Sequence, residues 1–226
     1  NLKRWLDGSN LDAHKPIMID FDHPERTIYT EMWPVLDRLD YRGNLFINTG
    51  QIEAMYEGSM PSDSERTLMT WDEIGELAET GWQIGAHTVT HPNLSEFAAE
   101  DPSGDLLREE LETCDTTIES RLGIQPNDFA FTGTSWSSVA EKEVMKRYRS
   151  GRLWIVGSEY NADGIPIRYA DLVGVSGDDE DDGGPPNEAR YITRESRPYR
   201  LPSMEITALI KEPAAFRRYL EGAINV

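Results

Sequence analysis

Two histidines in the middle of the chain have the residue type and spacing of a metal site. His87 and His91 stand four residues apart and are two of only four histidines in the sequence. On a helical turn, side chains at this spacing project from the same face, so both imidazoles can reach one divalent cation. Neutral imidazole suits zinc and neighbouring transition metals, and a catalytic site usually has three protein ligands and one open position. This central histidine pair therefore needs a third ligand.

A second group of ionisable residues follows the first apolar run of the chain. Residues 16–19 give way to Asp20, Asp22 and His23, and a proline comes next. Strand alternation places the two aspartates on one face and His23 on the other, unless the strand ends or bulges here, which the proline favours. Two interpretations stay open. The aspartates cap the next element, or an aspartate and His23 meet the central histidine pair.

The elements that must position these residues alternate between strand and helix patterns. Strands are predicted over residues 17–20, 45–47, 82–84, 129–131, 153–156 and 201–206, and helices over 29–39, 71–79, 106–122, 139–148 and 213–223. Such alternation implies an α/β fold with a largely parallel sheet. In these sheets, ligands and catalytic groups gather just beyond the strand ends. Both groups of ionisable residues lie at or just beyond the end of a predicted strand.

The chain is strongly acidic. Among 226 residues, 41 are acidic and 22 basic, which gives a net charge of −19. Self-repulsion of this size is relieved by salt, so a halophilic source is one explanation and an ordinary acidic soluble protein is the other. Nucleic acid and anionic membrane suit this surface poorly, and a neutral substrate fits better. The length fits one domain over residues 1–226.

Several further features limit the possible classes of protein. No apolar run approaches a membrane span, and the first residues lack the apolar core of a signal peptide, which a mature secreted chain would lack as well. Cys114 is the only cysteine and is expected to be a buried small hydrophobe. His14 is expected at the surface. The acidic run over residues 177–187 is expected to be a solvated loop and not a calcium site.

The central motif resembles a known family. The stretch from His87 to Leu94, with its lead-in Gly81 to Ala86, is similar to the His-Ser/Thr-x-x-His motif of the polysaccharide deacetylases, also called the NodB-homology domain or carbohydrate esterase family 4. Residues 15–23, 44–47 and 129–136 resemble the family's first motif, second strand and third motif. The resemblance implies a distorted (β/α)7 barrel and metal-dependent removal of acetyl groups from N- or O-acetylated carbohydrate. A divalent metal, with zinc as first choice, is the implied cofactor.

The resemblance also implies roles for residues near the start of the chain. The family's first motif is Thr-Phe-Asp-Asp, in which the earlier aspartate is the general base and the later one binds metal. Alignment on Phe21 makes Asp22 the base and His23 the third metal ligand, which gives a site of three neutral imidazoles. The rival register makes Asp20 the base and Asp22 the ligand. We prefer the first register because a site of three histidines is chemically sound.

The third motif implies the substrate-facing residues. A backbone N–H near Gly133 or Thr134 would stabilise the oxyanion that forms from the acetyl carbonyl. Trp136 could line the sugar site or belong to the core. The implied partner is an acetylated sugar or polysaccharide. The family suggests an extracellular or cell-envelope location, a cytoplasmic one stays possible, and the sequence gives no oligomeric state.

Departures from the family pattern keep a second function open. Thr132 and its neighbours replace the arginine or tyrosine and the Pro-Tyr pair of the third motif, and no histidine follows His91 to act as general acid. Glu205, Asp171 or a water molecule would have to protonate the leaving group. The alternative is a non-catalytic carbohydrate-binding or scaffold domain on the same barrel. A third interpretation gives the central histidine pair a purely structural role.

Overall fold

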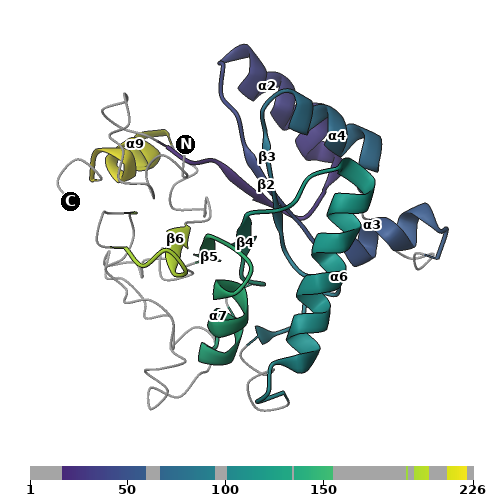
Figure 1. The fold of residues 1–226 in the computed structure, drawn as a ribbon. Helices are drawn as coiled ribbons and strands as arrows, with labels where there is room; N and C mark the ends of the chain where they lie inside the picture. The colour runs from purple at the N-terminus through teal and green to yellow at the C-terminus, as the bar shows by residue number, and fades with distance from the viewer. Residues whose placement is uncertain are drawn as a thin grey trace.

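A curled sheet of parallel strands forms the centre of the molecule (Figure 1). The computed structural model describes residues 17–59, 67–94, 101–133, 135–154, 192, 196–203 and 213–222. Six strands pair in chain order, namely β1 (Asp20–Asp22), β2 (Asn44–Ile47), β3 (Gln83–Ala86), β4 (Asp128–Ala130), β5 (Ser150–Trp154) and β6 (Leu201–Ser203). Every neighbouring pair is parallel, as the alternating pattern predicts.

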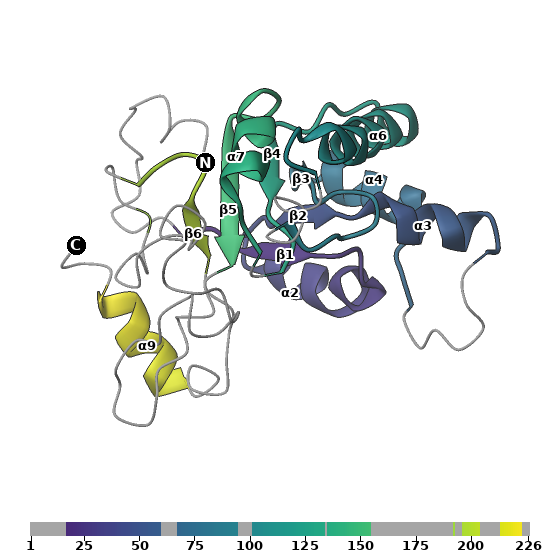
Figure 2. The same ribbon diagram turned by 90° about the horizontal axis from the view of Figure 1, so that it is seen from below.

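Helices cover the outer side of the sheet (Figures 1 and 2). They are η1 (Ile28–Met32), α2 (Trp33–Arg38), α3 (Thr49–Tyr56), α4 (Trp71–Glu79), α6 (Asp105–Leu122) and α7 (Ser138–Met145), while α9 (Pro213–Gly222) lies apart from the sheet. The arrangement is a distorted (β/α) barrel, with six strands in the described part of the chain where seven are expected. No helix in these described ranges is long and apolar enough to cross a membrane.

The apolar core lies between the sheet and the helices. Alternate residues of β2 and β3, such as Leu45, Ile47 and Ile84, are buried together with the apolar stripe of α6. Gly123 ends α6 in the left-handed conformation, with φ 67°, as the sequence predicts. Cys114 is fully buried in the same cluster, and burial raises the pKa of its thiol to about 12. The prediction of a buried small hydrophobe is confirmed.

The inner face of the curled sheet is polar, and this shifts the strands from their predicted positions. Asp20 and Asp22 belong to β1, Gln83 begins β3 and Ser150 begins β5. Polar strand residues that point inward are not part of an apolar run, so the apolar runs do not locate the ends of these strands. The predicted starts of β1 and β5 are therefore wrong by three residues each.

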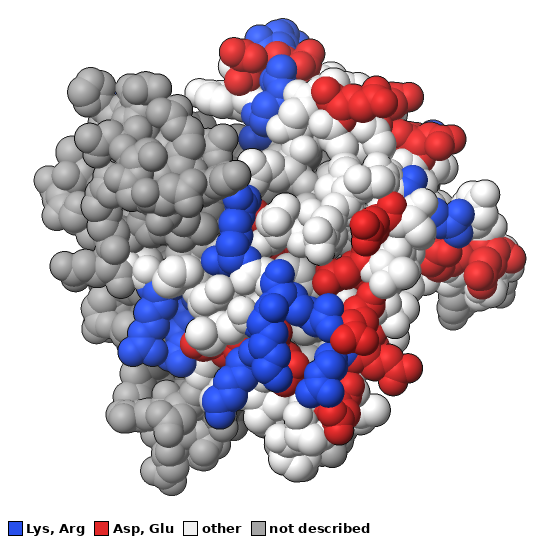
Figure 3. Space-filling model, viewed as in Figure 1, with Lys and Arg blue, Asp and Glu red and all other residues white. Residues whose placement is uncertain are grey.

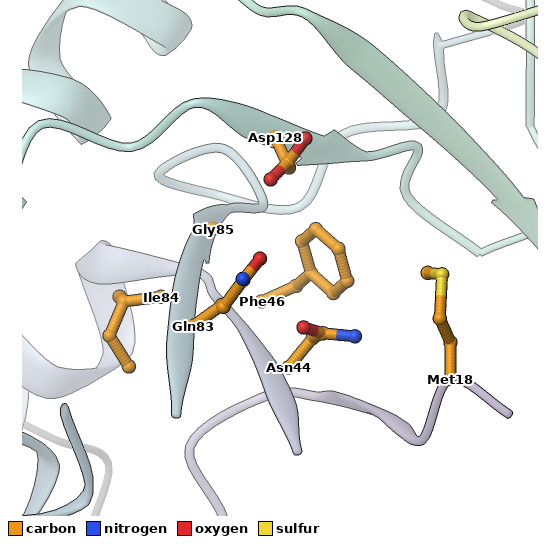
Figure 4. A pocket seen from close by; sticks show the side chains of 7 residues that line it. All are labelled: Met18, Asn44, Phe46, Gln83, Ile84, Gly85 and Asp128. Atoms are coloured by element: carbon orange, nitrogen blue, oxygen red, sulfur yellow. The ribbon is translucent and has the colours of Figure 1, made fainter. Parts of the chain in front are cut away.

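A small, partly open pocket lies on this inner face where β2, β3 and β4 begin (Figure 4). It is lined by Met18, Asn44, Phe46, Gln83, Ile84, Gly85 and Asp128. A Cβ atom at Gly85 would lie 2.5 Å from Cδ1 of Phe46, so glycine at this position leaves room for the phenyl ring. Because these strands are parallel, the pocket lies at the opposite end from the loops that carry the histidines.

Candidate metal centre

Three histidines meet beyond the carboxyl ends of β1 and β3. They are His23, directly after β1, and His87 and His91, which share the loop after β3. Each offers one ring nitrogen, and these three atoms lie within 4.8 Å of one another. Nitrogen ligands about 2.1 Å from a tetrahedral zinc ion are separated by about 3.4 Å. Small side-chain rotations therefore suffice for the three rings to bind one ion.

The backbone at these histidines departs from regular structure. His23, Thr88 and His91 have φ angles of 65°, 67° and 60°, which non-glycine residues rarely adopt. Strand β1 ends at Asp22, so His23 escapes strand alternation and turns toward the other rings. The prediction of a helical turn for the central histidine pair is wrong, because two left-handed residues bring the rings together instead. Such backbone strain is commonly found at functional sites.

A carboxylate from α6 holds the loop between the central histidine pair. Glu110 accepts hydrogen bonds from the backbone N–H groups of Val89 (2.8 Å) and Thr90 (3.0 Å) and from the Thr90 hydroxyl (2.7 Å). Within the loop, the hydroxyl of Thr88 accepts the N–H of His91 at 3.1 Å. Sequence reasoning missed this role, since Glu110 is one of several acidic residues on the same helix.

His87 is prepared to act as a ligand. Its side chain is fully buried, and its Nδ1–H donates to the carbonyl oxygen of Ala130 at 2.8 Å. Burial lowers the pKa of the ring to about 3, so the imidazole is neutral at physiological pH. Its Nε2 is buried without a hydrogen-bond partner. An unsatisfied buried acceptor costs about 1–3 kcal/mol, and a cation at Nε2 would satisfy it. These residues therefore fit a divalent metal.

The two aspartates lie on the inner face beside this cluster. Arg152 of β5, whose side chain is 5% exposed, forms an ion pair with Asp22, and its Nε lies 3.8 Å from the carboxylate of Asp20. Burial acts to raise the pKa of Asp22, but Arg152, followed by His87 and His23, brings it below its ordinary value. Asp22 is therefore ionised at neutral pH.

Asp20 lies deeper on the same strand. Its carboxylate accepts a hydrogen bond from Nδ2 of Asn44 at 2.8 Å, and burial raises its pKa despite Arg152. Among the described residues, the potential metal-binding group contains neither Asp20 nor Asp22. This geometry favours the register in which His23 is the ligand. Sequence reasoning missed Arg152, although an arginine directly before an apolar strand pattern is a visible signal.

The third motif lies beyond the end of β4. Gly133 has φ 54° and open space around its α-carbon, while Thr134 lies outside the described residues, as do Asp171 and Glu205. Trp136 is fully buried, its indole N–H donates to Glu141 at 2.9 Å, and the guanidinium of Arg200 lies 4.3 Å from the ring centroid. Of the two roles considered for Trp136, lining the sugar site or belonging to the core, this buried position fits the core.

Acidic and basic side chains gather in different regions of the surface seen in Figure 3. Acidic side chains are spread over much of this face, and basic side chains gather low on it. Basic residues of α6 and of the segment after α7 are ion-paired, for example Arg108 and Lys146 with Glu143 at 3.4 Å and 2.5 Å. This pairing reduces the positive charge available to an anionic partner. The expectation that nucleic acid is not bound stays a prediction.

Comparisons with known proteins identify the family and the fold of the chain. A family model described as polysaccharide deacetylase matches residues 10–148. The Streptococcus pyogenes deacetylase PplD, solved with acetate, is 19% identical with a TM-score of 0.57, and the match covers 77% of this chain and 76% of that one. The polysaccharide deacetylase BC0361 from Bacillus cereus is 16% identical with a TM-score of 0.61, over 97% of this chain and 55% of that one.

A third solved structure, the de-N-acetylase from Aggregatibacter actinomycetemcomitans, is 13% identical with a TM-score of 0.60 and coverages of 77% and 80%. No curated protein matches the chain. Identities this low establish a shared fold and leave the substrate open. The predicted barrel is confirmed.

Proposed function

The chain belongs to the polysaccharide deacetylase family, and we propose that it is a metal-dependent hydrolase that removes acetyl groups from carbohydrate. The metal ligands in this proposal are His23, His87 and His91, and zinc is the first choice of metal. The observation that carries it is the buried Nε2 of His87, which has no hydrogen-bond partner within a cluster of three imidazoles.

The chemistry divides between the cation and the protein. When bound, the cation lowers the pKa of a water molecule and polarises the acetyl carbonyl. Asp22 acts as general base and accepts the proton of the attacking water. Arg152 keeps this carboxylate ionised and restricts its orientation through their ion pair. A base that is already ionised at neutral pH can act without prior deprotonation.

The turn after β4 provides the remaining electrostatic stabilisation in this proposal. The carbonyl of Ala130, at the end of β4, accepts the hydrogen bond of His87, so this strand end lies beside the cluster. Gly133 follows three residues later in a left-handed turn. Backbone N–H groups at Gly133 or Thr134 would donate to the developing oxyanion. An acetylated, otherwise neutral glycan suits a chain of net charge −19.

One observation favours a second candidate function. Thr132, at the place of the family's third-motif arginine, is buried and its hydroxyl donates to the carbonyl of Pro92. It therefore does not supply the charge of an arginine. In this alternative, the barrel binds acetylated glycan without turnover, and His87→Ala leaves glycan binding unchanged.

Metal content and acetate release test both functions together. Protein reconstituted with zinc at high salt is analysed for bound metal and incubated with acetylated chito-oligosaccharides and acetylated xylan. The proposal expects stoichiometric zinc and acetate release in the wild type, loss of both in His87→Gln, and neither loss in His14→Gln, the same exchange at the remaining histidine. A wild type that takes up no metal and releases no acetate refutes the proposal. Glycan binding without turnover supports the alternative.

A further inference from the structure

We propose that Asn48 is a positioning residue that fixes the tautomer of His23 and so determines which of its nitrogens faces the cation. The inference rests on the proposed function. Asn48 directly follows β2, the strand between those that lead to the two histidine loops, and it is fully buried. Its side-chain Oδ1 lies 3.0 Å from Nδ1 of His23.

The direction of this hydrogen bond decides the tautomer. An amide oxygen only accepts, so the contact requires the proton of His23 on Nδ1 and leaves the lone pair on Nε2. The reversed amide would donate to Nδ1 and move the ring proton to Nε2, where it would block coordination. His87 has the same arrangement, because its Nδ1–H donates to the backbone carbonyl of Ala130. Two of the three rings thus present Nε2.

The backbone next to Asn48 connects the two histidine loops. The N–H groups of Thr49 and Gly50 donate to the carbonyl oxygens of Thr88 and Val89, each at 3.1 Å. A Cβ atom at Gly50 would lie 2.7 Å from the carbonyl oxygen of Val89, so this close approach requires glycine. Asn48 therefore holds His23 with its side chain, while the next two residues hold the loop of the central histidine pair.

The second polar atom of the same amide argues against a purely structural role. Nδ2 of Asn48 is buried without a hydrogen-bond partner. An unsatisfied buried donor destabilises the fold, so a leucine of similar size would serve packing better. The amide oxygen is then the part that the site uses. Asn48→Leu should preserve or raise thermal stability while it weakens metal binding, a combination that a residue needed only for folding would not give.

Zinc affinity, measured by competition with a chromophoric chelator, tests the inference. Asn48→Leu should bind zinc about 10–100-fold more weakly than the wild type, the usual effect of losing a partner of a metal-binding histidine. Asn48→Asp, whose carboxylate also accepts from Nδ1, should restore the affinity. Asn44→Leu is the control and should bind zinc as the wild type does, since Asn44 lies at the opposite end of β2 and donates to Asp20. Equal affinity of Asn48→Leu and wild type overturns the inference.

The tautomer itself can be read without metal. Long-range ¹H–¹⁵N NMR correlations report the tautomer of His23 in the metal-free protein, at a pH where imidazoles are neutral. They should show protonation at Nδ1 in the wild type and in Asn48→Asp. In Asn48→Leu they should show a mixture of both tautomers. Protonation at Nε2 in the wild type overturns the inference. If the wild type shows the predicted tautomer but takes up no zinc, the role of Asn48 is supported and the proposed function is refuted. Failure of the inference is therefore distinguishable from failure of the proposed function.

Discussion

The buried His87 should make the metal-free protein sensitive to mild acid. Burial lowers the pKa of this ring from 6.5 to about 3. The unfolded chain therefore binds more protons than the folded chain between these values. Stability is fully present above pH 6.5 and is lost as the pH falls toward 3, at about 1.4 kcal/mol per pH unit.

The size of the effect follows from that slope. Between pH 6.5 and pH 5 the loss is about 2 kcal/mol, and down to pH 3 it approaches about 5 kcal/mol. The free energy of unfolding of a domain is typically about 5–15 kcal/mol, so this one side chain accounts for a large fraction of it. Full burial of the ring means that solvent does not screen the effect.

Urea denaturation of chelator-treated protein at constant high salt, from pH 8 to pH 5, measures this loss. His87→Asn keeps a donor for the carbonyl of Ala130 but does not titrate, so its stability should fall by about 2 kcal/mol less than that of the wild type over this range. His14→Asn should follow the wild type. Carboxylate titrations are common to all three proteins and cancel in the comparison. Parallel curves for wild type and His87→Asn would refute the assignment of a buried, neutral ring.

Three further predictions concern the surrounding groups. Glu110→Gln should weaken zinc binding about tenfold and lower stability by about 1–2 kcal/mol, because one amide oxygen replaces a carboxylate that accepts three hydrogen bonds. Chelator competition measures the zinc affinity and urea denaturation measures the stability, with a change of the exposed Glu109 to glutamine as the control. An unchanged zinc affinity contradicts the prediction. Arg152→Gln should lower stability by about 3 kcal/mol and move the acidic limb of the pH–rate profile to higher pH, since Asp22 loses its ion pair. An acidic limb at the same pH as in the wild type contradicts the role of Arg152. Asp115→Asn should stabilise the protein by about 1–2 kcal/mol above pH 6 and not below pH 4. Burial raises the pKa of Asp115 to about 6, so the contribution of this side chain to stability is fully present below pH 3.8 and is lost as the pH rises through 6. Urea denaturation of wild type and variant at pH 8 and pH 4 measures the difference in stability. An equal difference at the two pH values would exclude the raised pKa.

Elements with strong local signals could be predicted from the sequence. Helix α4 spans Trp71–Glu79 as predicted, and Thr70 and Glu73 form a reciprocal capping box at its start. The sequence does not predict helix α3, because only Thr49 and Ile52 of this helix are buried and no apolar stripe marks it. The apolar runs locate the strands approximately, but polar strand residues such as Asp22 and Ser150 lie outside these runs, so the predicted strand boundaries are shifted.

Residue types identified the histidines of the candidate site, but their supports come from distant parts of the chain. Nothing in the sequence distinguishes Glu110 from Glu109, because only the folded loop brings the former to Val89 and Thr90. The ion pair between Arg152 and Asp22 likewise depends on the curvature that brings β5 near β1. The spacing of residues within one helix or strand does not reveal contacts between elements that are far apart in the chain.

The close approach of Gly85 and Phe46 limits how this sequence can diverge. A methyl group at position 85 would meet the phenyl ring at 2.5 Å, a distance that real Cβ atoms do not tolerate. The same ring lies 4.9 Å from the guanidinium carbon of Arg152, which in turn pairs with Asp22. An alanine at position 85 would thus disturb the proposed base through two intermediaries. A smaller side chain at position 46 would not by itself admit a larger residue at position 85, because the new Cβ atom would also lie 2.9 Å from the carbonyl oxygen of Asp128.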